Sequence, residues 1–287
     1  MAGTVLYQKF ARAYLFAEVN IISQEAGWTP NQFAKVMGKS GNTIRAWLDR
    51  ERLPDLGNLS LICDRGGVAE ARKRFILHVG EQLLTGSELI SNLEQRNMYV
   101  VESAERTYGS FVKWDPVLPS ALVQTEAFHM VLQPEPLEGR ASKVKHWLRK
   151  KQRQENFFSR IATAESPTAE IYIPSSIFAV LDRLSAKDKR AQIDRMIEVN
   201  AMPGCEVLVV RSPLVVPFSF EGFKAAGQSA AGPDFVYVET FDQSRHVVEP
   251  RNLAVYDQAR SLLRADSQGI EGFLDGGIHR LAEEHPE

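Results

Sequence analysis

The chain has 287 residues, of which 44% are hydrophobic and 24% are charged, and its formal net charge is −2. This composition excludes disordered and fibrous proteins, and the length is typical of about two domains. No segment approaches the roughly 20 successive apolar residues that cross a bilayer, and the first residues lack the pattern of a secretory signal, so we expect a soluble, cytoplasmic protein without a membrane segment. Cys63 and Cys205 stand among apolar neighbours, which predicts two reduced, packed thiols rather than a disulfide framework.

Charge is distributed unevenly along the chain. Residues 1–75 hold eleven Lys and Arg against seven Asp and Glu, a balance of +4, which leaves −6 for the rest because the total is −2. A basic head on an acidic body favours a polyanion as the partner of the head.

The first elements predicted along the chain are short helices. Leu15, Val19 and Ile22 recur at helical spacing, and Gly27 ends that pattern as a C-terminal glycine does. Residues 29–32 then have the order of a helix start, with a threonine N-cap, a proline in the first turn and a capping-box glutamine.

A turn and a second capped helix follow. Gly38 permits a tight turn, Ser40 can cap the next helix, and Pro54 must end it. Two short helices joined by a glycine turn predict a helix-turn-helix. An ordinary helical hairpin with solvated charges is the alternative interpretation.

The helix predicted at residues 41–49 has an apolar side and a polar side. If Ile44, Trp47 and Leu48 face the core, the 100° step per residue turns Asn42 and Arg45 outward. Asn pairs with adenine and Arg with guanine in the major groove, while hydroxyl groups near a helix start and nearby cations hold phosphates. The predicted DNA-binding residues are Asn42 and Arg45 for bases, Ser40 and Thr43 for phosphate at the helix start, and Lys35, Lys39, Arg50 and Arg52 for the remaining phosphates.

Residues 16–63 resemble the Xre-class (Cro/repressor-like) helix-turn-helix regulators. The resemblance is carried, in the family's order, by Gly38, Ser40, Ile44, Trp47 and Leu53-Pro54. Many members have Glu at the position of Leu48 and Gly at the position of Arg50, so the end of the second helix departs from the family pattern. The resemblance implies sequence-specific binding to double-stranded DNA.

Beyond the head, the sequence predicts a mixed body. Apolar residues from Ala69 to Arg96 predict a long, mostly helical connection. The second half alternates strand signals at 170–173, 206–210 and 235–238 with helical signals at 143–161, 187–199 and 252–263, and the stretch after residue 265 is expected to be frayed or loosely docked. We therefore predict an α+β fold with an all-α helix-turn-helix domain (1–75), a connecting helix (76–96) and a larger mixed α+β regulatory or partner-binding domain (97–287).

The body carries a second resemblance. Residues 119–128, PSALVQTEAF, resemble the iPGLLQTxxYA signature of the large C-terminal domain of actinobacterial WhiJ-like regulators, with Ser120 in place of the usual Gly. Arg153-Gln154 and the VYVE run at 236–239 resemble two further motifs of that family in the expected order. The resemblance implies a transcriptional regulator that is often encoded beside a small companion protein and is described in places as antitoxin-like, and it carries over no catalytic residue. From the residues alone, Thr125 fits a helix N-cap and Pro119 a loop position better than ligand contacts.

A basic run lies within the predicted helix 143–161 and just before it. Seven Lys and Arg occur between Glu138 and Glu155 without an acid. Such a run is most often a solvated helix face, and auxiliary DNA contact or docking of an acidic partner are the alternatives. Because Val144, Trp147 and Leu148 predict one packed side, we expect an exposed basic stripe opposite, with these candidate partner-binding residues: Lys143, Arg149, Lys150 and Arg153.

An enzymatic function has little support in the sequence. The histidines form no metal-binding pair at helical spacing, and no glycine-rich phosphate motif occurs. We therefore expect no enzyme, no metal and no cofactor, although Glu239, His246 and Asp257 could in principle assemble a site.

The function predicted from these patterns is sequence-specific transcriptional regulation at the nucleoid. One such head offers few contacts, so we expect a homodimer on paired half-sites. The alternative is an antitoxin-like scaffold that captures a small partner and whose head does not bind DNA strongly, which the departures at Leu48 and Arg50 keep open. A third alternative is a body that senses a small ligand.

Overall fold

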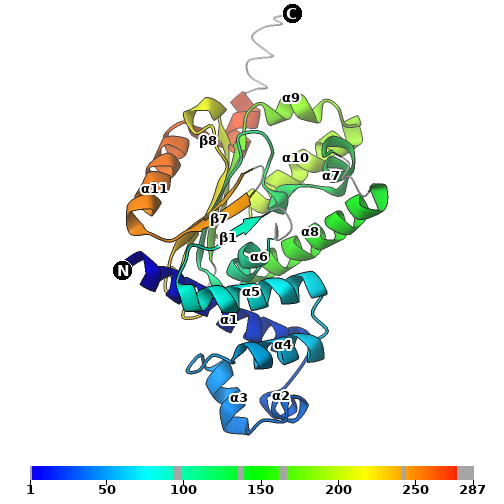
Figure 1. Cartoon of the computed structure of the whole chain (residues 1–287). Helices are drawn as coiled ribbons and strands as arrows, with labels where there is room; N and C mark the ends of the chain where they lie inside the picture. Colours follow the sequence, from blue (N-terminus) through cyan, green and yellow to red (C-terminus); the bar gives the residue numbers. More distant parts are fainter. Residues whose placement is uncertain (1, 93–97, 135–138, 162–166, 241–242, 277–287) are drawn as a thin grey trace, which may run out of the picture. The chain divides into compact units, whose positions relative to one another are not determined.

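The computed structural model describes residues 2–92, 98–134, 139–161, 167–240 and 243–276 (Figure 1). By packing, the chain forms a first unit of Met1–Gly109 with Phe223–Leu253 and a second unit of Ser110–Gly222 with Ala254–Glu287. The first unit contains the predicted head, the predicted connection and part of the predicted C-terminal domain. The two units do not follow the predicted domain boundaries at 75 and 96, which therefore stay predictions. Within the described residues, no helix combines the length and apolar composition that crossing a bilayer requires.

Helices make up the N-terminal part of the first unit. They are α1 (Ala2–Glu25), α2 (Pro30–Met37), α3 (Gly41–Leu48), α4 (Leu56–Arg65), α5 (Glu70–Thr85) and α6 (Tyr99–Thr107). Helix α1 packs against α3, α4, α5 and α6, and its Leu15, Val19 and Ile22 are buried as predicted. The predicted start of α2 is confirmed, because the Thr29 hydroxyl accepts from the Gln32 amide while the Gln32 side chain accepts from the Thr29 amide.

The prediction of a helix as far as Arg96 is wrong for the described residues 86–92. Helix α5 ends at Thr85 because Gly86 adopts a left-handed φ of 63° and its amide donates to the Gln82 carbonyl at 3.0 Å. A Cβ at Gly86 would lie 2.3 Å from a side-chain carbon of Thr4, so only glycine fits at this close approach. The chain then enters a strand at residues 90–92, and residues 93–96 lie outside the described ranges.

The first unit also contains a small antiparallel arrangement of strands. In the order β1-β7-β6, it consists of β1 (Ile90–Asn92), β7 (Gln243–Val247) and β6 (Phe235–Glu239). Strand β6 confirms the prediction at 235–238, and its Tyr237 pairs with His246 of β7. Strand β5 (Phe220–Lys224) contains the point at which the chain passes between the two units.

The second unit combines parallel strands with helices. Its strands are β2 (Ser110–Trp114), β3 (Thr168–Pro174) and β4 (Cys205–Val210), which pair in parallel, and β8 (Ser267–Gly269), which pairs antiparallel with β4. Its helical elements are η1 (Ala121–Val123), α7 (Glu126–Leu132), α8 (Arg140–Ile161), α9 (Ile177–Leu181), α10 (Ala186–Asn200), η2 (Pro213–Val215) and α11 (Pro250–Ala265), whose first residues lie in the first unit. Strands β3 and β4 confirm the strands predicted at 170–173 and 206–210, where mostly apolar runs are typical of strands buried on both faces. Helices α8, α10 and α11 confirm the three predicted long helices. The fold is α+β, as predicted.

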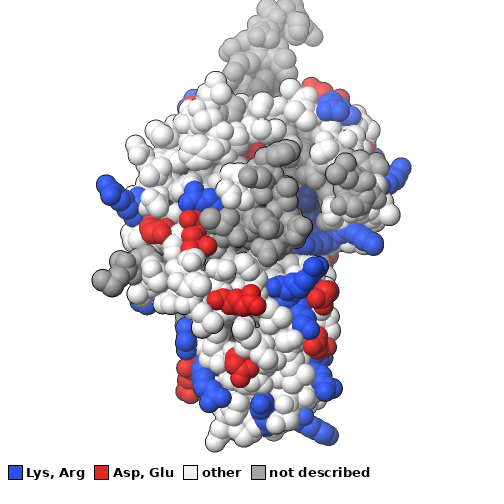
Figure 2. All heavy atoms as spheres, viewed as in Figure 1, with Lys and Arg blue, Asp and Glu red and all other residues white. Residues whose placement is uncertain are grey.

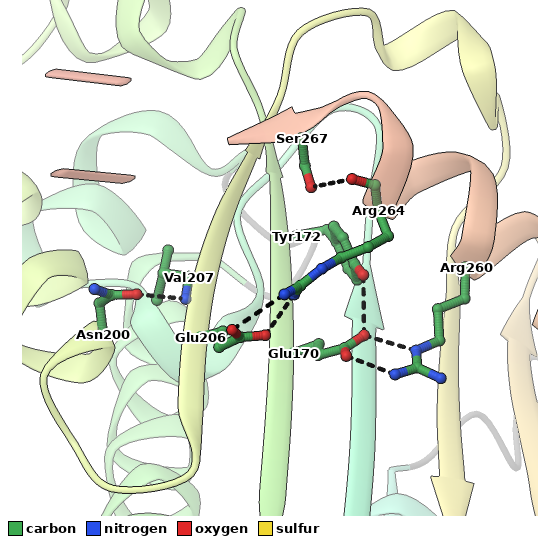
Figure 3. Close-up of polar contacts among 8 residues, drawn as sticks. All are labelled: Glu170, Tyr172, Asn200, Glu206, Val207, Arg260, Arg264 and Ser267. Carbon is green, nitrogen blue, oxygen red and sulfur yellow. Dashed lines mark hydrogen bonds and ion pairs between the residues drawn. The ribbon is translucent and has the colours of Figure 1, made fainter. Parts of the chain in front are cut away.

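Helix α11 is fastened to β3 and β4 by charged groups (Figure 3). Arg260 binds both carboxylate oxygens of Glu170, with Nη2 at 2.6 Å from Oε1, and Arg264 pairs with Glu206. The Tyr172 hydroxyl donates to the same Glu170 carboxylate at 2.9 Å. Burial alone would raise the pKa of Glu170, but the bonds from Arg260 and Tyr172 hold that pKa below its ordinary value.

The expectation of a loose end after Ala265 is wrong for the described part of that segment. Residues 267–269 form β8 beside β4, Ile270 is fully buried, and the Phe273 ring stacks on Phe178 with centroids 5.1 Å apart. Strand pairing and apolar contacts therefore hold the chain as far as Phe273, and residues 277–287 lie outside the described ranges.

Both cysteines are buried free thiols, as predicted. Burial raises the pKa of Cys63 to about 12 and that of Cys205 to about 11. Both thiols are therefore protonated at neutral pH and are poor nucleophiles.

Candidate nucleic-acid interface

Helices α2 and α3 are two short helices joined by a tight turn. Gly38 adopts a left-handed φ of 61° at the end of α2, and the Ser40 hydroxyl accepts from the Thr43 amide at 3.2 Å at the start of α3. The side chains between the two helices are buried, namely Phe33, Met37, Ile44 and Trp47. The turn glycine and the second N-cap are therefore confirmed as the sequence predicts.

The predicted base-reading residues lie on the outer side of α3. Asn42 and Arg45 are exposed, three residues apart on the helix, while Ile44 between them is fully buried. Figure 2 shows Lys and Arg side chains around the end of the first unit that α2 and α3 form, with some Asp and Glu among them. Exposed side chains that belong to the predicted phosphate-contacting set are Lys35, Lys39, Ser40 and Arg52, and Thr43 is half-buried with its hydroxyl 2.9 Å from that of Ser40.

Arg50 is the member of the predicted set that does not face outward. Its side chain is half-buried, and its Nη1 donates to the Ala230 carbonyl at 2.5 Å and to the Ser229 carbonyl at 3.4 Å. Burial lowers the pKa of Arg50 from its ordinary value. The guanidinium is thus engaged by the chain itself, and this geometry gives no support to the prediction that Arg50 holds a phosphate.

The end of α3 agrees with the predicted helix at residues 41–49 to within one residue, but Pro54 does not cause it. The helix stops at Leu48, six residues before Pro54, because Arg50 adopts a left-handed φ of 63°. The Glu51 amide then donates to the Ala46 carbonyl at 3.0 Å, which closes the last turn. From α1, the side-chain Nδ2 of Asn20 donates to the Leu48 carbonyl at 3.3 Å, so the end of α3 is anchored to the long first helix.

The predicted basic stripe on α8 is only partly exposed. Lys143 is buried and donates to the Met130 carbonyl at 2.9 Å and the Gln133 carbonyl at 2.6 Å, where it closes the end of α7. Arg153 is buried with its Nη2 3.6 Å from a Glu221 carboxylate oxygen. The expectation that these two side chains belong to an exposed stripe is wrong, since each is needed by polar groups in the interior. The exposed basic residues of α8 are Arg140, Lys145, Arg149 and Lys151.

Lys150, the fourth predicted member, lies in a neutral polar cluster. Its Nζ is 2.5 Å from Gln124 Oε1, 3.3 Å from Gln133 Oε1 and 3.1 Å from His129 Nδ1. Burial, with a smaller effect from the charge of Arg153, lowers the pKa of Lys150 to about 7. The ammonium form is therefore held by uncharged acceptors and is half-populated near neutral pH.

The signature-like loop at residues 119–125 is held by glutamines that sequence reasoning did not single out for this role. Gln154 of α8 donates to the Ala121 carbonyl at 2.7 Å and to the Gln124 carbonyl at 2.9 Å. Gln192 of α10 is fully buried, donates to the Val123 carbonyl at 2.8 Å and accepts from Thr125. The available signal for Gln154 was its place in the Arg153-Gln154 motif, whereas Gln192 stands among charged residues and gave none. Both amides are buried and therefore need partners.

The N-cap predicted at Thr125 is confirmed. Its hydroxyl accepts from the Phe128 amide at 3.3 Å at the start of α7. The signature-like motif therefore positions a loop and begins a helix, which is a structural task.

The three residues that could have formed an enzymatic site differ in exposure: the histidine is buried, and both acids are exposed. His246 is fully buried, its Nδ1 lies 3.0 Å from the Leu89 carbonyl oxygen, and burial lowers its pKa to about 4. Glu239 is exposed at the end of β6 in the first unit, and Asp257 is exposed on α11 in the second unit. Across the described ranges, no three His, Cys, Asp or Glu side chains are grouped so that they could hold a metal ion.

Residues 101–269 match the family described as "Domain of unknown function (DUF5753)". This segment includes the signature-like loop, the α8 glutamine and β6, and it excludes α2 and α3. Searches of curated proteins and of solved structures found no match.

Proposed function

We propose that this chain, which belongs to the DUF5753 family, is a sequence-specific DNA-binding transcriptional regulator. The observation that carries the proposal is the outer face of α3, the second of two short helices joined by a tight turn, where Asn42 and Arg45 are exposed. The family is found in actinobacterial regulators that contain a helix-turn-helix, which agrees with the resemblance of the head to Xre-class regulators and of the body to WhiJ-like regulators.

In the proposed mechanism, α3 enters the major groove and presents Asn42 and Arg45 to base edges. The Ser40 hydroxyl and the free amides at the start of α3 face a phosphate, and Lys35, Lys39 and Arg52 neutralise further phosphates. One short helix reads few bases, so the protein acts as a homodimer on paired half-sites, in the cytoplasm at the nucleoid.

The test is a comparison of specific and non-specific affinity. Duplexes that the protein binds are selected from a random library, and fluorescence anisotropy then measures the Kd for selected and random duplexes across a salt series. Arg45→Ala is expected to cost about 1–3 kcal/mol on the selected duplex and much less on random DNA, whereas Lys39→Ala weakens both and lowers the salt slope by about one. Arg74→Ala, a change at an exposed arginine of α5, is the control and should alter neither. Equal losses on both duplexes for Arg45→Ala would contradict the role of that residue.

A second function is favoured by the outer surface of α8. Val144 and Leu148 lie one helical turn apart and are 42% and 58% exposed, with Lys145 and Arg149 next to them. Lys and Arg side chains are visible over α8 in Figure 2. An apolar pair between cations fits a partner with an acidic, apolar helix face, so we propose that this surface binds the small companion protein that the family resemblance implies.

This second proposal has its own test. The product of the gene beside that of this chain is titrated by isothermal calorimetry, and gel shifts compare DNA binding with and without it. Leu148→Glu is expected to abolish the complex, whereas Gln152→Glu, a change on the same exposed side of α8, should weaken it only slightly. If Leu148→Glu binds the companion protein as tightly as the wild type does, the companion binds another surface.

A further inference from the structure

Helices α1, α2, α3 and α4 end in the same way, but α3 has an arginine at a position where the other three have glycine. In each case an amide beyond the helix bonds back over the last turn: Trp28 to Ser23, Lys39 to Ala34, Glu51 to Ala46 and Val68 to Cys63, at 2.9 to 3.0 Å. The motif requires a residue in the left-handed conformation, and that residue is Gly27, Gly38 or Gly67, with φ of 61° to 67°, at the ends of α1, α2 and α4. At the end of α3 it is Arg50, with φ of 63°. A side chain is disfavoured in this conformation, so the arginine needs a compensating role.

The side chain of Arg50 supplies that role. Its Nη1 bonds to the carbonyls of Ser229 and Ala230, which lie 179 and 180 residues further along the chain. Both carbonyls belong to the loop of residues 225–234 between β5 and β6. This loop is inside the family-matched segment, and α3 is outside it.

The β5–β6 loop is itself fixed to the helices of the first unit. The Tyr108 hydroxyl donates to the Pro233 carbonyl at 2.8 Å, and the Asp234 carboxylate accepts from the Ala225 amide at 2.8 Å. At Gly232 a Cβ would meet the Ala13 side chain of α1 at 2.5 Å, so the loop backbone lies directly against that helix. Arg50 therefore joins the end of α3 to a defined structure.

We propose that Arg50 is a positioning residue that couples the DNA-reading helix to the family domain through the β5–β6 loop. The proposal rests on the proposed DNA-binding function. Arg50 holds the outer end of α3 against the loop and so sets the direction in which Asn42 and Arg45 point. Because the guanidinium is engaged by carbonyls of the chain, its loss alters base discrimination without removing a phosphate contact.

The test compares Arg50→Gly and Arg50→Ala with the wild type and with Arg52→Ala, a change at an exposed arginine two residues away. Glycine suits the left-handed conformation, whereas alanine retains the strain, so Arg50→Gly should be the more stable of the two variants in urea. Both variants should lose the link equally. Hydrogen exchange should then be about tenfold faster at the Gln228 and Ala231 amides in both variants and unchanged in Arg52→Ala.

The DNA readout separates positioning from phosphate binding. Both Arg50 variants should lower the ratio of affinities for selected and random duplexes at least fivefold with an unchanged salt slope, while Arg52→Ala lowers the slope and keeps the ratio. Unchanged exchange at the two loop amides, or an equal loss on both duplexes with a slope reduced by about one, overturns the proposal. If the wild type binds no duplex, the proposed function fails, and the coupling of α3 to base discrimination falls with it, while the exchange result still decides whether Arg50 joins α3 to the loop.

Discussion

The Arg72 guanidinium of α5 donates to the Glu18 carboxylate of α1 at 2.9 Å, and only 2% of the Glu18 side chain is exposed. Arg72 also bonds Glu25 at 2.8 Å, and Glu25 accepts from Arg106 of α6 at 2.8 Å. Burial raises the pKa of Glu18, and the charge of Arg72 opposes that rise. The Glu18–Arg72 pair therefore ties α1 to α5, and the Glu25–Arg106 pair ties α1 to α6.

Loss of the arginine should expose the cost of that burial. Arg72→Met leaves Glu18 in the interior without its cation, so the free energy of unfolding is expected to fall by about 3–5 kcal/mol in urea denaturation. Arg74→Met, at an exposed residue of the same helix, is the matched control and should change it by less than about 0.5 kcal/mol. A loss no larger than that of the control would show that Glu18 reaches water or another partner.

The glutamine that holds the signature-like loop gives a second prediction. Gln154→Leu removes the donor to the Ala121 and Gln124 carbonyls, and the unfolding free energy should fall by about 2–4 kcal/mol because both acceptors are then unsatisfied. Gln152→Leu, at an exposed residue of α8 that bonds only Asn156 at 3.2 Å among the bonds described, should be nearly neutral. Similar unfolding curves for the two variants would contradict the stabilising role of Gln154 at the loop.

His246 predicts a dependence of stability on pH. Its pKa is about 4 in the folded protein and about 6.5 in an unfolded chain, so only the unfolded state takes up the proton between these values. The stabilisation is complete above pH 6.5, falls by about 1.4 kcal/mol per pH unit below it, and is lost below about pH 4. His246→Asn keeps an N–H for the Leu89 carbonyl and should flatten this part of the profile, whereas His146→Asn, at an exposed residue of α8, should not. A wild-type profile that is already flat from pH 6.5 to 4.5 argues against a neutral, buried imidazole.

Local signals in the sequence predicted the DNA-binding candidate well. Thr29, Ser40 and Gly38 act through bonds to residues within five positions, so their roles follow from spacing and residue type. The end of α5 was missed because a close approach between Gly86 and Thr4 decides it, and 82 residues separate the two in sequence.

The surfaces assigned to charged residues were less predictable. A run of cations does not say which of them face the interior, and Lys143 is drawn inward by carbonyls at the end of α7, a requirement that only the packed structure reveals. Arg50 was marked in the sequence as a departure from glycine, but its conformation and its partner at Ala230 depend on a loop 180 residues away.

The choice of residue at position 50 has a wider consequence. Arginine and glycine codons can differ by a single base, so one mutation converts the end of α3 into the glycine type found at three neighbouring helices. Such a change would relax the backbone and remove the bond between α3 and the β5–β6 loop in the same step. Relatives could thus be sorted, from this position alone, into proteins in which α3 is bonded to the family domain and proteins that lack this bond.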